Sequence, residues 1–276
     1  MSGQLDQWAE WLLRMRYEGR SDGEVEEMHA EVAAFRDNVL DNAHLHPGDT
    51  VVDVGAGLGL LTLAAAERVA PDGDVLAVDI SVDALEELRR IATAPNISYL
   101  VGSADVLPLP DASVDVVMTR SVLIYVDDKA EAAREFFRVL RDGGRVSIFE
   151  PINRHNARLS DAFDFGDLRE RVGAWERKKY ENRADPMLNF DERDLERMFR
   201  EAGFRDVNGD LREGEWELSA EQVLTVVGAP GRPSLLDDWT HEFGAEDAER
   251  LAAAVRAAGS VRRSWSQLYL TARKPG

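Results

Sequence analysis

Cysteine is absent from this sequence of 276 residues, and lysine is rare. Without cysteine the chain forms no disulfide, offers no thiolate nucleophile and builds no cysteine-ligated zinc site, so we predict no metal centre. The 33 basic residues include only four lysines, and the 52 acidic residues bring the net charge to −19. Because a field of this sign repels phosphate backbones, we expect no nucleic acid among the partners.

Long apolar runs are also missing. No stretch of roughly eighteen or more apolar residues occurs, so we expect no membrane span. The N-terminal segment has no basic region followed by an apolar one, which argues against a signal peptide. These absences together predict a cytoplasmic protein. The length suits one large α/β domain, and nothing in the composition indicates an oligomeric state.

Strand and helix patterns alternate along residues 50–149. Continuous apolar runs rich in β-branched residues are typical of strands buried on both faces of a parallel sheet. Such runs lie at 50–54, 75–78, 97–101, 114–118 and 145–149, with helical patterns at 60–69, 82–92 and 129–140. The alternation predicts a Rossmann-like, doubly wound α/β fold with helices on both faces. Strand-like segments at 204–216 and 265–272 are expected to complete a mostly parallel sheet of seven strands.

The chain divides by pattern into four segments. Residues 1–45, with aromatic residues at helical spacing, are expected to form an N-terminal helical lid over a cofactor-binding core at 46–151. In residues 152–200 aromatic and charged side chains mix without a clear period, and we interpret this segment as a substrate cap. Residues 201–276 return to regular patterns and are expected to complete the sheet, so that all four segments form one structural domain.

A glycine-rich turn directly follows the first predicted strand. Gly55, Gly57 and Gly59 are spaced G-x-G-x-G within the sequence VVDVGAGLG. The dinucleotide fingerprint G-x-G-x-x-G would need its third glycine where Leu60 stands. Asp53, at the strand end, places a carboxylate where a pyrophosphate would be repelled and a cation would be welcome. S-adenosylmethionine carries a sulfonium and an ammonium but no phosphate, so this turn favours it over a nicotinamide cofactor.

Two acidic residues follow the next strands. Asp79 ends the second strand, twenty residues after Gly59, where a carboxylate can accept hydrogen bonds from a ribose diol. By itself this residue is compatible with either cofactor. Asp105 follows the third strand, where its carboxylate can accept from an adenine amine while Ala104 or Val106 packs on the ring.

The motifs also occur in a characteristic order. DVGAGLG, VDIS, GSADVLPLPDASVDVV and FFRVLRDGGRVSIFEP together resemble the class I S-adenosylmethionine-dependent methyltransferases of the ubiquinone/menaquinone-biosynthesis type, closely over residues 45–151. The resemblance implies an enzyme that transfers a methyl group to an O, N or C nucleophile of a small molecule and releases S-adenosylhomocysteine. It places the methionine end of the cofactor at Asp53, Gly55, Ala56, Gly57 and Gly59, the ribose and adenine at Asp79, Ile80, Ala104, Asp105 and Val106, and further contacts at Arg120, Ser121 and Tyr125. The family often has histidine where this chain has Tyr125.

Methyl transfer from a sulfonium depends on alignment more than on a catalytic group. The donor is already activated, so the protein mainly holds acceptor, methyl carbon and sulfur in line, and a base helps only if the acceptor must lose a proton. We therefore assign no catalytic residue and keep His155, Tyr17 and Glu150 as candidates. Candidates for substrate contact are Arg14, Tyr17, Asn153, His155, Trp175 and Tyr180. Each of these side chains has an ordinary structural role as its alternative.

Other functions stay open beside this one. A non-methylating S-adenosylmethionine-binding protein, or a partner subunit, fits the same motifs. An NAD(P)-dependent oxidoreductase is disfavoured by the glycine spacing and by Asp53. Nucleic-acid methylation is disfavoured by the net charge and because the fourth strand is followed by Arg120-Ser121-Val122 rather than by an Asn/Asp-Pro-Pro-aromatic motif. The sequence does not identify the acceptor.

Overall fold

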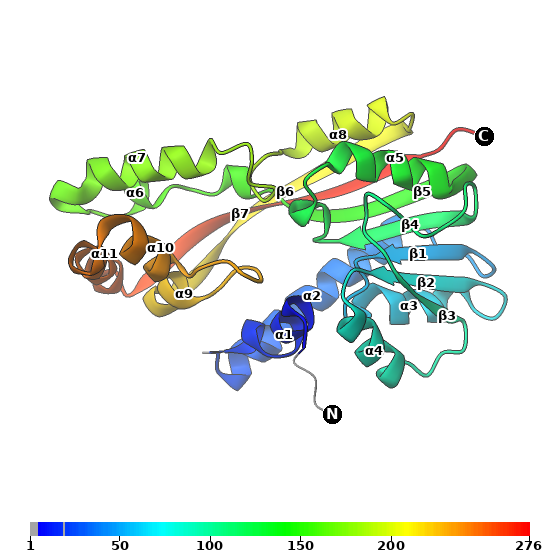
Figure 1. Cartoon of the computed structure of the whole chain (residues 1–276), viewed down its shortest axis with the longest axis horizontal. Coiled ribbons are helices and arrows are strands. Elements are labelled where there is room, and N and C mark those ends of the chain that lie inside the picture. Colours follow the sequence, from blue (N-terminus) through cyan, green and yellow to red (C-terminus); the bar gives the residue numbers. More distant parts are fainter. Residues whose placement is uncertain (1–4, 19) are drawn as a thin grey trace.

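Seven strands form a single sheet in the computed structural model, which describes residues 5–18 and 20–276 (Figure 1). They are β1 (Thr50–Val54), β2 (Asp74–Asp79), β3 (Ile97–Val101), β4 (Val114–Arg120), β5 (Leu140–Pro151), β6 (Arg205–Ser219) and β7 (Ser260–Arg273). Their order is β3-β2-β1-β4-β5-β7-β6. Strands β1 to β5 pair in parallel, whereas β7 runs antiparallel to both of its neighbours. The predicted Rossmann-like, mostly parallel sheet of seven strands is confirmed.

Helices cover both faces of this sheet, as predicted. One face carries α2 (Asp22–Asn42), α3 (Leu60–Val69) and α4 (Val82–Ile91), and the other carries α5 (Lys129–Val139) and α8 (Glu192–Glu201). The helices pack by one side because their apolar residues recur at helical spacing. In α3, for example, Leu61, Ala65 and Val69 are buried in the same cluster as Val51 of β1 and Val116 of β4.

A second lobe lies apart from the sheet-covering helices (Figure 1). It consists of α6 (Leu159–Ala162), α7 (Arg169–Tyr180), α9 (Ala220–Thr225), α10 (Leu235–Phe243) and α11 (Ala245–Ala257). These helices bury an apolar cluster of their own, with Trp239 fully enclosed and Val172, Leu224 and Leu251 around it. The molecule therefore has two hydrophobic cores, which we call the core of the sheet and the core of the second lobe.

Strands β6 and β7 connect the two cores. Strand β5 ends at Pro151, which pairs with Gln267, but the pairing of β6 with β7 continues to Ser219 and Ser260. The far halves of these strands form a two-stranded ribbon that runs between α7 and α9 (Figure 1).

The structure groups the segments after residue 151 differently from the sequence prediction. Helix α8, expected within the cap at 152–200, packs on α5 in the core of the sheet. Residues 220–257, expected only to complete the sheet, pack with α6 and α7 in the second lobe. The second lobe is therefore built from two separate stretches of chain, which β6 and β7 connect to the sheet, and its role as a substrate cap stays a prediction.

The N-terminal segment reaches the carboxyl-terminal edge of the sheet. Helix α1 (Gln7–Leu13) begins at Asp6, whose carboxylate accepts two backbone N–H groups of the first turn. A 3₁₀ turn at Met15–Tyr17 follows, and α2 then starts with a capping box at Ser21. Of the lid expected at 1–45, residues 1–4 and 19 lie outside the described residues.

Candidate cofactor site

The glycine-rich turn between β1 and α3 has the backbone that its glycines permit. A Cβ on Gly55 would lie 2.2 Å from the Val122 side chain, so this glycine allows the turn to pack against the loop after β4. Gly57, with φ of 50°, has open space except for Leu12 of α1, whose methyl carbon lies 3.2 Å from the position of a Cβ. Gly55 therefore allows the turn to pack closely against the loop after β4, while Gly57 lies on the side of the turn that faces α1.

Asp79 is fixed beside this turn. Its Oδ2 accepts the Gly57 N–H and its Oδ1 accepts the Ser81 N–H, both at 2.8 Å. Burial raises the pKa of the Asp79 carboxyl, and these two hydrogen bonds oppose the rise. Each oxygen keeps a free lone pair, so the carboxylate is oriented and still able to accept from two hydroxyl groups.

Asp53 lies beneath the turn and is fully enclosed. Its Oδ2 accepts the hydroxyl of Thr62 at 2.5 Å, which ties the end of β1 to the first turn of α3. Burial raises the pKa of Asp53 to about 7, and the neighbouring Asp79 adds to the rise. A cation bound above the turn would favour the charged forms of both carboxyls.

The ends of β2 and β3 expose apolar side chains at the same edge. Ile80 is 51% exposed and Val106 is 69% exposed. Ala104, two residues before Val106, is buried and packs this loop against the core of the sheet. Asp105 lies in this loop beside Val106 and is partly exposed. Exposed apolar side chains next to an acidic acceptor suit a planar, weakly polar ring with an amine.

The loop after β4 is held by Glu150. Its carboxylate is completely buried and accepts the backbone N–H groups of Val122, Leu123 and Ile124 at 2.8, 2.8 and 3.0 Å. Burial raises the pKa of Glu150 to about 7, with these three donors opposing the rise. Both carboxylate oxygens are thus engaged by backbone, which makes Glu150 a positioning residue rather than a free base.

The same loop presents Ser121 and Tyr125. Ser121 adopts a positive φ of 55° and donates its N–H to the Phe149 carbonyl at 2.8 Å. The Tyr125 ring packs edge-on against Trp8 of α1, with ring centroids 4.9 Å apart. The positive φ of Ser121 therefore turns the chain at the carboxyl end of β4, and the loop that follows places Tyr125 against α1.

Arg120 ends β4 and forms no ion pair within 4.0 Å among residues 5–18 and 20–276. Its guanidinium lies 5.6 and 5.7 Å from the rings of Phe35 and Phe149, and its Nε has no hydrogen-bond partner. Burial lowers the pKa of Arg120 to about 10, and the nearby Arg16 adds to this. An enclosed cation with an unsatisfied N–H is a binding position for an anionic group.

Helix α1 covers the turn from outside. The Ser81 hydroxyl donates to Asp6 at 2.7 Å, and the Asp6 backbone N–H donates to Asp83 at 2.6 Å. These bonds tie the start of α1 to the start of α4, and they set Leu12 over Gly57. The lid predicted at the N-terminus remains a prediction, and this placement is compatible with it.

The candidate substrate residues are not brought together. Arg14 is paired with Glu10 at 3.3 Å, and its side chain is 66% exposed. Tyr17 contacts His29 of α2 with its hydroxyl at 3.3 Å. Both side chains are thus engaged with neighbours in the N-terminal segment.

The remaining candidates lie on two other elements. His155 and Asn153 sit in a 3₁₀ turn after β5, where the His155 Nε2 lies 2.9 Å from a carboxylate oxygen of Glu192 on α8. Trp175 and Tyr180 lie on α7 in the second lobe. The contact with Glu192 engages only the Nε2 atom of His155 and leaves its Nδ1 for another partner, and the catalytic assignment stays a prediction.

Several neighbours of the site were not found from sequence. Asp6 could have been recognised as a helix N-cap before an apolar stretch at helical spacing. Thr62 under Asp53 carries no such signal, since a threonine in the first turn of a helix is unremarkable. Lys129 is buried with its Nζ on the Val126 and Pro186 carbonyls, and no periodic pattern distinguishes it from an exposed lysine.

Comparison with known proteins identifies the family of the chain. Residues 52–148 match the methyltransferase-domain family. UbiE of Cronobacter sakazakii, a C-methyltransferase of ubiquinone/menaquinone biosynthesis, is 33% identical over 184 residues, covering 61% of this chain and 71% of that protein. The chain belongs to the UbiE-type class I S-adenosylmethionine-dependent methyltransferases. This methyltransferase takes its methyl group from S-adenosylmethionine, which confirms the family, the enzyme class and the cofactor predicted from its motifs.

Solved structures show the same fold. A protein of Bacillus halodurans C-125, described as a methyltransferase candidate, has a TM-score of 0.58 at 18% identity, over 88% of this chain and 100% of that one. The [4+2]-cyclase SpnF has a TM-score of 0.52 at 20% identity, over 88% of this chain and 80% of that one. Because a cyclase shares the fold, the assignment to the methyltransferases rests on the sequence match and not on the architecture.

Two absences hold for the part of the chain that the structure covers. No helix within residues 5–18 and 20–276 is long and apolar enough to cross a bilayer. Within the same ranges, no group of three or more His, Asp or Glu side chains is placed to hold a metal ion.

Proposed function

We propose that this methyltransferase transfers its methyl group to a small-molecule acceptor by in-line displacement at the edge formed by β1, β2 and β4. The observation that carries the proposal is the Asp79 carboxylate, fixed by the Gly57 and Ser81 N–H groups with lone pairs to spare. The UbiE relatives are named for methylation in ubiquinone/menaquinone biosynthesis, which supports a small organic acceptor.

The geometry supports one orientation of the cofactor. Asp79 accepts the ribose hydroxyl groups, and Ile80 with Val106 encloses the adenine while Asp105 accepts its amine. The negative charge of Asp53 favours the ammonium and sulfonium end above the turn. The unpaired guanidinium of Arg120 is placed to receive the methionine carboxylate.

Chemistry at this edge requires few protein groups. The cofactor supplies an electrophilic methyl carbon on a sulfonium when bound. The protein's part is to hold the donor against the turn, to fix the loop after β4 through Glu150, and to cover the edge with α1 so that water is excluded. Proton removal from the acceptor depends on the acceptor's own acidity, and no residue is assigned to it.

The cofactor arrangement is tested by calorimetric titration of S-adenosylhomocysteine into the wild type and into Asp79→Ala. We expect the variant to bind at least about 100-fold more weakly, since it loses two charge-assisted hydrogen bonds to the ribose. Asp72→Ala, in the exposed turn before β2, is the matched control and keeps wild-type affinity. Unchanged affinity in Asp79→Ala, or tight binding of NADH by the wild type, contradicts the arrangement.

The acceptor class is tested with methyl-labelled S-adenosylmethionine. Purified enzyme is incubated separately with the dialysable, nucleic-acid and protein fractions of a bacterial extract. We expect label to enter the dialysable fraction only. Label in nucleic acid or protein would overturn the assignment to a small molecule while leaving the cofactor arrangement intact.

A further inference from the structure

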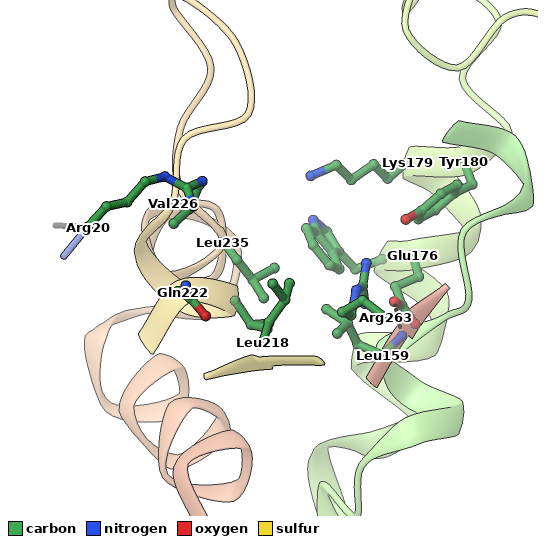
Figure 2. Close-up of a pocket in the computed structure, with 12 residues that line it drawn as sticks. Arg20, Leu159, Glu176, Lys179, Tyr180, Leu218, Gln222, Val226, Leu235 and Arg263 are labelled. Carbon is green, nitrogen blue, oxygen red and sulfur yellow. Dashed lines mark hydrogen bonds between the residues drawn. The ribbon is translucent and has the colours of Figure 1, made fainter. Parts of the chain in front are cut away.

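A cavity of about 280 Å³ lies between the second lobe and the N-terminal segment. Figure 2 shows its two sides, with α7 on one and α9 together with Arg20 on the other. The ribbon contributes Leu218 from β6 and Arg263 from β7. Nothing in the cofactor arrangement above uses this space.

The apolar part of the lining is extensive. It comprises Leu159, Trp175, Leu218, Val223, Val226 and Leu235. Leu218 and Leu235 are labelled in Figure 2 among the side chains of the lining. A cavity of this size, lined mainly by apolar side chains with a few polar groups, is typical of a binding site for a small organic molecule.

The charged part of the lining is positive. Arg20, Lys179 and Arg263 contribute to it, and Glu176 is the only acidic residue in the lining. Glu176 is buried, and its carboxylate accepts the Leu159 N–H at 2.6 Å and the Ser160 N–H and hydroxyl at 3.0 and 2.5 Å. Glu176 is thus held by neutral donors at the start of α6, and among the described residues it forms no ion pair with the arginines of the lining.

The arginines of the lining also have no other counter-ion. In a chain with 52 acidic residues, most partly buried arginines are ion-paired. Within residues 5–18 and 20–276, five partly buried arginines have no carboxylate within 4.0 Å: Arg16, Arg20, Arg120, Arg158 and Arg263. Two of them line the cavity, and Arg158 stacks 3.5 Å from the ring of Tyr180, which also lines it. Arg20 and Arg263 thus bring positive charge to this cavity, whereas Lys179 is paired with Asp238 and Glu24 interacts electrostatically with Arg20.

The N-terminal segment contacts both the cofactor edge and the cavity. Leu12 lies over Gly57 at the turn, and Arg20, eight residues later, lines the cavity. Between them stands Arg16, close enough to Arg120 to lower its pKa, and the Arg20 Nε donates to the Arg16 carbonyl at 3.1 Å. One continuous segment thus borders both places.

We infer that this cavity binds an apolar molecule carrying one anionic group, such as a carboxylate or sulfonate, with the anion on Arg263. We assign the occupant to the acceptor: its apolar body and anion lie in the second lobe, and its reacting atom extends along the N-terminal segment to the cofactor. This assignment rests on the proposed function, whereas the binding chemistry of the cavity stands without it.

The test uses two fluorescent probes that differ only in charge. Anilinonaphthalene sulfonate carries one sulfonate, and N-phenylnaphthylamine is the same aromatic body without it. Both are titrated into the full-length wild type, Arg263→Gln and Arg262→Gln. Arg262 is the matched control, because it is adjacent on β7 but exposed and outside the lining.

We expect the wild type to bind the sulfonate probe more tightly than the neutral one. Arg263→Gln should bind the sulfonate at least about tenfold more weakly, with the neutral probe unchanged, because only the charge-assisted contact is lost. Arg262→Gln should match the wild type for both probes. Equal sulfonate affinity in the two variants, or equal affinity of the wild type for the two probes, would overturn the inference.

Two further readouts separate this inference from the proposed function. Binding of S-adenosylhomocysteine is expected to be the same in all three proteins, so its loss throughout would count against the cofactor arrangement and not against the cavity. The sulfonate probe is expected to inhibit methyl transfer to the dialysable fraction in the wild type, and to do so at least about tenfold less effectively in Arg263→Gln. Tight probe binding without inhibition would overturn the assignment of the cavity to the acceptor.

Discussion

The cofactor edge of the sheet and the cavity of the second lobe offer charges of opposite sign. At the edge, Asp53, Asp79 and Glu150 have hydroxyl or backbone N–H groups as partners and no cation within ion-pair distance. In the cavity, Arg20 and Arg263 form no ion pair within 4.0 Å in the part of the chain that the structure describes. The donors at the edge are neutral groups, so they satisfy the hydrogen bonding of the carboxylates without cancelling their negative charge. The edge is therefore complementary to a cationic group of a ligand and the cavity to an anionic one.

The comparison separates the two ligands by chemistry. A donor with a sulfonium and an ammonium is favoured by carboxylates, and an acceptor with an anion is favoured by arginines. Arg120 is the exception at the edge, since it is a cation that lies against the rings of Phe35 and Phe149. The donor has a carboxylate of its own, and one arginine is what that group requires.

The largest expected effect comes from removing one buried carboxylate in each region. Glu150→Ala strands three buried N–H groups of the loop after β4, and we expect it to lower the free energy of unfolding by about 3 kcal/mol or more. Glu176→Ala strands two N–H groups and a hydroxyl at α6 and should cost about 2 kcal/mol. Urea denaturation measures both.

Cofactor affinity distinguishes these two variants. Glu150→Ala is expected to lose binding of S-adenosylhomocysteine, because the loop that carries Ser121 and Tyr125 is no longer fixed. Glu176→Ala should keep wild-type affinity, and exposed Glu181→Ala is the control for both. If Glu176→Ala also lost cofactor affinity, the two regions would not be separate binding units.

An intermediate effect is expected for Asp53→Asn, and it depends on pH. The folded-state pKa of Asp53, about 7, lies above its ordinary value of 3.8, so the folded protein holds this proton more tightly than the unfolded chain does. The contribution to stability is therefore full below about pH 4 and is lost as pH rises to about 7. Asparagine does not titrate, so the stability of the variant relative to the wild type should rise across this window.

Ligand charge sharpens the same test. Asp53→Asn should weaken S-adenosylmethionine, which has a sulfonium, more than S-adenosylhomocysteine, which has a neutral thioether. Asp74→Asn, exposed at the opposite end of β2, controls for the net charge. If Asp53→Asn lost the same factor of affinity for both ligands, Asp53 would have no role in recognising the sulfonium.

The smallest expected effect concerns the adenine position. Ile80→Ala should weaken S-adenosylhomocysteine about fivefold, since it removes apolar surface from the base, while stability changes little because Ile80 is half exposed. Ile91→Ala on α4 removes the same side chain at 41% exposure and should leave the affinity unchanged. Calorimetry on both variants checks this, and equal affinities would place the adenine elsewhere.

The core of the sheet could be predicted closely from sequence. The runs at 50–54 and 97–101 and the helix at 60–69 have the same bounds in the structure. These elements are buried on both faces or carry a regular apolar side, so local pattern and environment agree. The turn at Gly55 was recognisable because strand, glycines and helix follow one another directly.

The second lobe could not be predicted in the same way. Helix α7 has a charged sequence in which Val172 is fully buried, and its position depends on α10 and α11, more than fifty residues later. Trp175 and Tyr180, predicted as candidates for substrate contact, line the cavity, and Arg263, which completes the lining, lies on a strand expected only to fill the sheet. Contacts between distant segments leave no periodic trace in either segment.

Strand β7 has a consequence for the order in which this chain can fold. Its residues 267–273 pair with β5, and its residues 260–266 belong to the ribbon of the second lobe. Synthesis proceeds from the N-terminus, so the edge of β5 stays unpaired, and neither core is closed, until this strand has left the ribosome. An open edge beside incomplete cores is the arrangement most exposed to pairing with another chain. Expression should therefore be more sensitive to changes in residues 260–273 than to changes of equal size in the helices.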